Sequence, residues 1–140
     1  MLAVAAVVMA VFAGCAAAGT PGTVSGVLKD IQTNIIENVS DSEAKSIIAA
    51  TSDMVILDVR MPEEFSTGHL ENAINVDFKA SSFKNELGKL DKNKSYLVYC
   101  RTGKRSAESA RIMTELGFSH ISNLLGGITQ WQTEGGAVVK

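Results

Sequence analysis

The chain has 140 residues, which is enough for one compact domain and a short additional segment but not for a second core. Its formal net charge is −2 and no charged residue precedes Lys29, so the chain lacks the basic excess that nucleic-acid binding requires. Apolar residues make up 46% of the chain but are unevenly spread, and residues 1–18 contain no charged side chain.

Residues 1–18 form an apolar leader. The run is slightly shorter than the roughly 20 residues of a membrane-spanning helix and ends in small residues, which is typical of a signal sequence. The segment Phe12-Ala13-Gly14-Cys15 resembles the lipobox of bacterial lipoproteins, so Cys15 is a candidate lipidation site. Cleavage after an Ala-x-Ala site such as residues 16–18, an uncleaved anchor or a different start stay open, because the leader lacks an initial Lys or Arg. Each alternative predicts an exported domain on the periplasmic or cell-envelope side, and the lipobox predicts a membrane-anchored lipoprotein.

Residues 19–38 are expected to be a tether between the leader and the domain. Gly, Thr, Pro and Ser come early, and the later part has no clear period, so its end is predicted to form a short helix. The domain is expected to cover residues 39–140. It opens with Ser40-Asp41-Ser42-Glu43, a capping box in which the Ser40 hydroxyl and the Glu43 carboxylate satisfy free N–H groups at a helix start.

Short apolar runs alternate with helical stretches along the rest of the domain. Residues 54–57 are unbroken by polar side chains, which is typical of a strand buried on both sides. Further strands are predicted at residues 73–76, 96–99 and 120–124. Helices are predicted at residues 81–90, 104–116 and 128–133, with Gly117 ending the longest of them. This alternation predicts an α/β fold with a parallel β-sheet flanked by helices on both faces.

Residues 97–106 combine a strand, a short loop and a helix start, and they contain Cys100. Ligands of such sheets bind beyond the carboxyl ends of the strands, which is where Cys100 is expected. The helix start and the loop N–H groups favour a thiolate, and Gly103 lets the loop curl around an anion. Cys100 could instead be only a small buried hydrophobic residue. The basic residues that follow it argue against this alternative: Arg101, Lys104, Arg105 and Arg111.

Neither a disulfide nor a metal site is expected. Cys15 belongs to the leader, so the domain has a single cysteine, and His69 and His120 have no ligand-like spacing to Cys100. No cofactor and no nucleic-acid partner are expected. A monomer is predicted, because no strong apolar surface stripe is evident.

Several ordered motifs carry a resemblance to single-domain rhodaneses, a family of thiosulfate sulfurtransferases. Residues 100–106, Cys-Arg-Thr-Gly-Lys-Arg-Ser, resemble the active-site loop of that family. Residues 58–60, 64–65 and 68–75 are similar to its upstream signature, and residues 125–127 with Trp131 resemble its closing segment. The resemblance covers residues 39–139 and departs from the family at Ala137, where a proline is common.

The resemblance implies that Cys100 is a catalytic nucleophile. Its thiolate would attack the outer sulfur of thiosulfate, sulfite would leave, and a persulfide would persist until cyanide or a thiol accepts the sulfur. The charges of Lys104 and Arg105 would attract the donor. The implied substrate-binding residues are Arg101, Thr102, Gly103, Lys104, Arg105 and Ser106. No membrane partner beyond the N-terminal tether is implied.

A persulfide carrier and a phosphatase are the alternatives to a free-standing sulfurtransferase. A non-catalytic persulfide carrier or binding module serving a partner protein needs the same loop, so this alternative stays open. Cysteine phosphatases have a longer interval between their cysteine and arginine than residues 101–104 provide, which disfavours phosphatase chemistry.

Three charged residues after the first buried strand are expected to support the structure: Asp58, Arg60 and Glu64. Arg60 and Glu64 are predicted to form an ion pair that braces the turn. No further acid or base is expected, because a preformed thiolate needs none. His69 is predicted to be a hydrogen-bonded structural residue, and Arg111 to be solvated or salt-bridged.

Overall fold

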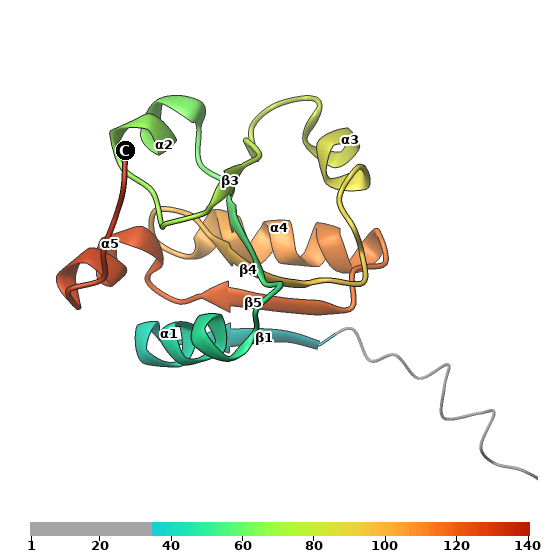
Figure 1. The fold of residues 1–140 in the computed structure, drawn as a ribbon. Coiled ribbons are helices and arrows are strands. Elements are labelled where there is room, and N and C mark those ends of the chain that lie inside the picture. The colour runs from blue at the N-terminus through green and yellow to red at the C-terminus, as the bar shows by residue number, and fades with distance from the viewer. Residues whose placement is uncertain (1–34) are drawn as a thin grey trace, which may run out of the picture. The chain divides into compact units, whose positions relative to one another are not determined.

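The computed structural model describes residues 35–140. The predicted leader, Cys15 and residues 19–34 of the predicted tether lie outside the described residues. Figure 1 shows one sheet with helices packed around it. Among residues 35–140, no helix has the length and apolar character needed to cross a bilayer.

Ten elements alternate along the chain. The strands are β1 (Ile35–Val39), β2 (Val55–Asp58), β3 (Ile74–Asn75), β4 (Ser95–Tyr99) and β5 (His120–Leu124). The helices are α1 (Asp41–Ala50), α2 (Pro62–Thr67), α3 (Phe83–Gly88), α4 (Lys104–Glu115) and α5 (Gly127–Thr133). The strands pair in the order β1-β5-β4-β2-β3, and every pairing is parallel. The predicted parallel α/β sheet is therefore confirmed.

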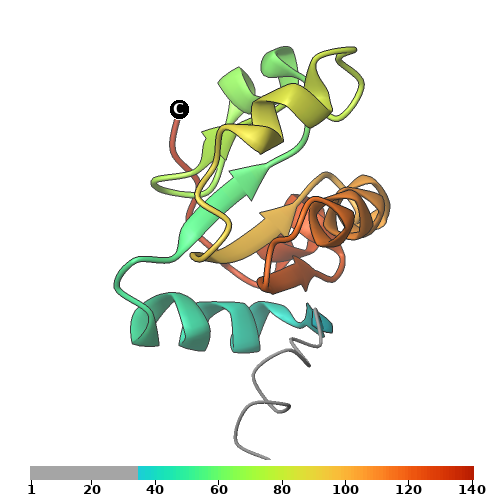
Figure 2. The same ribbon diagram turned by 90° about the vertical axis from the view of Figure 1, so that its right-hand side faces the viewer.

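The central strand β4 divides its side chains between two cores. Tyr96 and Val98 lie in the core beneath α3 and α4, whereas Leu97 and Tyr99 lie in the core beneath α1 and α5. This alternation follows from the two-residue period of a strand. Helices cover both faces of the sheet, as Figure 2 shows from the side. The first core also contains Cys100, which continues the period of Tyr96 and Val98.

Local signals in the sequence placed the ends of two helices correctly. At α1, the Ser40 N–H donates to the Glu43 carboxylate at 2.8 Å and the Glu43 N–H donates to the Ser40 hydroxyl at 3.4 Å, so the capping box is confirmed. After α4, Gly117 has φ +91°, and the Phe118 N–H donates to the Met113 carbonyl at 3.1 Å. This left-handed ending is the one that glycine permits at low cost.

Residues 35–38, predicted to belong to the tether and to end in a helix, form the edge strand β1 instead. The prediction was wrong because β1 depends on a distant partner: it pairs with β5, with Asn38 beside Asn123. The Asn123 side chain donates to the Asn38 side chain at 2.9 Å. Helix α2 was not predicted, and β3 and α3 are shorter than the predicted 73–76 and 81–90.

Candidate active site

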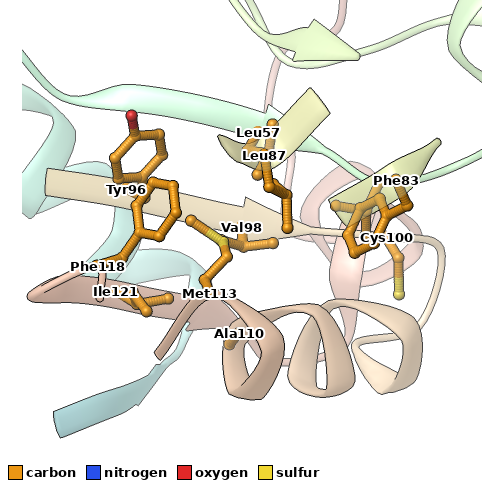
Figure 3. Close-up of a cluster of buried hydrophobic side chains, with 11 residues drawn as sticks. Leu57, Phe83, Leu87, Tyr96, Val98, Cys100, Ala110, Met113, Phe118 and Ile121 are labelled. Atoms are coloured by element: carbon orange, nitrogen blue, oxygen red, sulfur yellow. The ribbon is translucent and has the colours of Figure 1, made fainter. Parts of the chain in front are cut away.

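Cys100 is the first residue after β4, and α4 begins at Lys104. The residue is 1% exposed and lies on the α4 side of the sheet. Figure 3 shows its sulfur beyond the end of β4, near the first turn of α4. The sequence-based placement of Cys100 at the carboxyl edge of the sheet is thus confirmed.

Hydrogen bonds from the loop and from the start of α4 hold the Cys100 sulfur. The Gly103 N–H donates to Sγ at 3.1 Å, and the Ser106 hydroxyl donates to it at 3.6 Å. Burial raises the pKa of the Cys100 thiol, but hydrogen bonds from the Ser106 side chain and from backbone N–H groups of the loop outweigh burial, and the pKa is lowered. Gly103 adopts φ +90°, the left-handed conformation that lets the loop turn its N–H inward. The site therefore favours a thiolate.

The start of α5 holds the same loop from the other side. The Ile128 N–H donates to the Cys100 carbonyl at 2.9 Å, and the Thr129 N–H donates to the Arg101 carbonyl at 3.2 Å. A Cβ on Gly127 would lie 2.4 Å from the Cys100 carbonyl oxygen, so only glycine allows this approach. The segment from Gly127 to Thr129 therefore fixes the loop backbone.

The four basic residues near Cys100 differ in whether their charge is paired. The Arg105 guanidinium forms two hydrogen bonds to the Glu64 carboxylate, at 2.8 and 3.0 Å. Arg111 is exposed and pairs with Glu108 at 2.9 Å, as predicted. Within residues 35–140, the exposed side chains of Arg101 and Lys104 have no hydrogen bond or ion pair. The open positive charge of the loop is therefore that of Arg101 and Lys104.

Glu64 bridges α2 to the start of α4. The Arg105 side-chain hydrogen bonds lower the pKa of the Glu64 carboxyl to about 2, although burial acts in the opposite direction. The predicted Arg60–Glu64 ion pair was wrong. Arg60 instead pairs with Asp58, which lies closer in the turn and holds it by several hydrogen bonds, one of them 2.6 Å long.

The Asp58–Arg60 pair is buried at the end of β2. The side chains are 0% and 6% exposed, and the Arg60 guanidinium also donates to the Gly68 carbonyl at 2.7 Å. The pair therefore ties the β2 end to the segment after α2. His69 in that segment contacts the Phe65 carbonyl through Nδ1 at 3.0 Å, as predicted for a hydrogen-bonded residue.

A cleft of about 350 Å³ lies beside the loop. Its walls come from the β2–α2 segment, from the loop and from α5, and the polar residues that line it are Arg60, Glu64, Thr67, Arg101, Thr129 and Gln132. Arg101 belongs to both the loop and the cleft, and Glu64 links the cleft to Arg105. The cleft is thus joined to the Cys100 loop through Arg101 and through the Glu64–Arg105 ion pair.

The sequence model of the rhodanese-like domain family matches residues 40–134. The chain belongs to this family. The match contains the strand, the loop and the helix that surround Cys100, together with α2 and the start of α5. The resemblance inferred from the motifs is therefore confirmed.

Relatives of this rhodanese-like chain include proteins described as sulfurtransferases. A sulfurtransferase of Allochromatium vinosum is 29% identical over 103 residues, which is 73% of this chain and 94% of the relative. A thiosulfate sulfurtransferase of Escherichia coli is 34% identical over 70 residues, which is 50% of this chain and 67% of the relative. The rhodanese-like domain and these relatives support membership of a sulfurtransferase family.

The fold agrees with solved rhodanese structures. A rhodanese-related protein of Thermoplasma volcanium has a TM-score of 0.65 and 30% identity, covering 74% of this chain and 97% of that protein. A rhodanese-like domain protein of Staphylococcus aureus has a TM-score of 0.61 and 26% identity, covering 69% and 91%. The single rhodanese-like domain of the described residues is thus confirmed.

The sequence-predicted loop residues occupy different positions in the rhodanese-like site. Ser106 is buried against the Cys100 sulfur, Thr102 is exposed, and Gly103 and Arg105 are half-buried. Sequence reasoning missed the cleft residues Thr67, Thr129 and Gln132, because each is a single polar residue with no motif around it, and α2 and α5, which carry them, are far apart in the sequence. Among residues 35–140, no three His, Cys, Asp or Glu side chains converge as metal ligands would.

Proposed function

We propose that this protein is a thiosulfate sulfurtransferase that works through a persulfide on Cys100. The observation that carries the proposal is the environment of the Cys100 sulfur. The sulfur accepts a hydrogen bond from the Gly103 N–H at 3.1 Å, and the pKa of the Cys100 thiol is lowered. Two basic residues beside it, Arg101 and Lys104, are unpaired within the described residues. A thiolate is the nucleophilic form of cysteine, and a cationic loop attracts an anionic sulfur donor. Membership of a sulfurtransferase family supports the same chemistry.

The first step transfers one sulfur atom to the protein. The Cys100 thiolate attacks the outer sulfur of thiosulfate, a new S–S bond forms, and the S–S bond of thiosulfate breaks. Sulfite leaves with the electron pair of the broken bond, so no external oxidant or reductant is needed. The loop N–H groups and the charge of Lys104 stabilise the negative charge that the persulfide retains.

The second step returns Cys100 to the thiolate. An acceptor, either cyanide or a thiolate, attacks the outer persulfide sulfur, and the S–S bond breaks with its electron pair on Cys100 Sγ. The product is thiocyanate or the persulfide of the acceptor thiol. Because Cys100 is 1% exposed, we infer that donor and acceptor act in turn rather than together.

The test separates loading of the sulfur from turnover. The purified full chain is incubated with thiosulfate, its intact mass is measured, and thiocyanate is followed after cyanide is added. We expect a gain of one sulfur atom and thiocyanate release, both lost in Cys100→Ser. A sulfur gain without turnover indicates a carrier that serves a partner protein. The absence of any gain contradicts the proposal.

We also propose that the protein is exported and anchored to a membrane through a lipid on Cys15. The support is the lipobox-like segment Phe12-Ala13-Gly14-Cys15, which lies outside the described residues. In cells fed a labelled lipid precursor, the wild-type chain and Cys100→Ala should take up the label, whereas Cys15→Ala should not. Label retained in Cys15→Ala contradicts this proposal.

A further inference from the structure

The cleft beside the loop has the size of a small-molecule site. Its volume is about 350 Å³, whereas small-ligand pockets generally begin near 300 Å³. Ile128 is the one apolar residue among those that line it, so the cleft suits a polar occupant rather than an apolar one. The proposed transfer of sulfur from thiosulfate to Cys100 gives no role to Thr67, Thr129 or Gln132.

The charges around the cleft favour an anion. Arg60 is neutralised by Asp58, and Glu64 is neutralised by Arg105. Arg101 is exposed, and no residue of the described part of the chain pairs with it. The net result is one guanidinium without a counter-ion, a group that binds carboxylates with two parallel hydrogen bonds.

Uncharged hydrogen-bonding groups from α5 also line the cleft. The Thr129 hydroxyl and the Gln132 side-chain amide are exposed on α5, and neither contacts another polar group of residues 35–140. The backbone of α5 is joined to the loop by the hydrogen bonds from Ile128 to Cys100 and from Thr129 to Arg101. The cleft is therefore held in a fixed position relative to the reactive residue.

We propose that this cleft binds the sulfur acceptor, a small thiol that carries a carboxylate, and that the Arg101 guanidinium binds that carboxylate. The proposal rests on the proposed function, because it assigns the second of its two steps. The acceptor thiolate attacks the outer sulfur of the Cys100 persulfide, and the new S–S bond belongs to the acceptor. The electron pair of the broken bond returns to Cys100 Sγ, so the charges balance. Arg101 makes no bond to the reacting sulfur atoms and acts as a specificity-determining residue.

The test uses two acceptors that differ only in charge. The full chain is first loaded with sulfur, its mass is checked, and excess donor is removed. N-acetylcysteine or N-acetylcysteine amide is then added, and the loss of the extra sulfur is timed by mass. The ratio of the two rate constants measures the preference for a carboxylate and cancels effects on the persulfide itself.

We expect the ratio to fall by about fivefold to tenfold in Arg101→Gln, the effect of losing one partly exposed charge-assisted hydrogen bond. Arg101→Lys should give an intermediate ratio, because it keeps the charge without the two-pronged geometry. Arg111→Gln is the matched control, since it removes an exposed arginine outside the cleft. Its ratio should equal that of the wild type.

Two results would overturn the inference: an unchanged ratio in Arg101→Gln, or an equal fall in Arg111→Gln, which would indicate only a general effect of net charge. Failure of the proposed function is seen separately, because thiosulfate then loads no sulfur at all. In that case inorganic polysulfide loads Cys100 instead, and the same ratio still tests the role of Arg101.

Discussion

The ends of β2 and β4 lie side by side in the sheet but differ in how their charges are used. The two strands are in register to their last residues, Asp58 beside Tyr99. Beyond β2, Arg60 turns back onto Asp58 and both are buried. Beyond β4, Arg101 and Lys104 are exposed and have no partner in residues 35–140. An internally paired strand end serves as scaffold, whereas an unpaired cationic end is available to an anionic ligand.

Breaking the buried Asp58–Arg60 pair at the end of β2 should have the largest effect on stability. Arg60→Met leaves the Asp58 carboxylate, which is 0% exposed, without its counter-ion. We expect a loss of about 3–5 kcal/mol in the free energy of unfolding. The double variant Asp58→Asn/Arg60→Met removes both charges and should recover part of that loss. Urea unfolding measures both values, and a loss below about 1 kcal/mol in Arg60→Met would show that the pair is not part of the scaffold.

Disturbing the contact between the start of α5 and the Cys100 loop should have the next largest effect on stability. Gly127 and Gly135 both have positive φ, +58° and +72°, so an added Cβ strains each backbone by about 1–2 kcal/mol. Only the Cβ at Gly127 meets the loop, 2.4 Å from the Cys100 carbonyl oxygen, whereas Gly135 has open space. Gly127→Ala should therefore cost about 1–3 kcal/mol more than Gly135→Ala.

The rate of persulfide formation gives a second measure of the same pair of variants. Gly127→Ala should slow sulfur loading of Cys100, because the carbonyl that it displaces belongs to the reactive residue. Gly135→Ala should load at the wild-type rate. Equal stability and equal loading in the two variants would mean that α5 does not fix the loop.

The same contrast explains what the sequence could predict. The strand, loop and helix around Cys100 are contiguous, so the apolar run, Gly103 and the helix start were all visible locally. The partner of Arg105 was not, because Glu64 lies 41 residues away and is brought near only when α2 packs beside α4. The Arg60–Glu64 pair was predicted as a brace of the turn, but Arg60 pairs with Asp58 in the folded turn, and Glu64 pairs with Arg105. Edge strand β1 was missed for the same reason, since its pairing depends on β5.

Breaking the Glu64–Arg105 ion pair, which links α2 to α4, should have a smaller effect on stability, and that effect depends on pH. The folded pKa of Glu64 is about 2, below its ordinary value of 4.5. The ionised form therefore stabilises the fold above pH 4.5, and this contribution is lost as the pH falls from 4.5 towards 2. Glu64 and Arg105 are about one-fifth exposed, so Glu64→Gln should cost about 1 kcal/mol at pH 6 and less at pH 3. Urea unfolding at the two pH values checks this, and a constant difference would contradict it.

The smallest expected effect is on the acidity of Cys100. Ser106→Ala removes the hydroxyl that donates to the sulfur at 3.6 Å, so it should raise the pKa of Cys100. Ser109→Ala is the matched control, because the Ser109 hydroxyl donates to the Arg105 carbonyl and not to the sulfur. The pH dependence of alkylation by iodoacetamide measures the shift, and coincident curves for the two variants would contradict the role of Ser106. Because the Gly103 donor is part of the backbone and survives both substitutions, the acidity left in Ser106→Ala measures what the loop itself contributes to the thiolate.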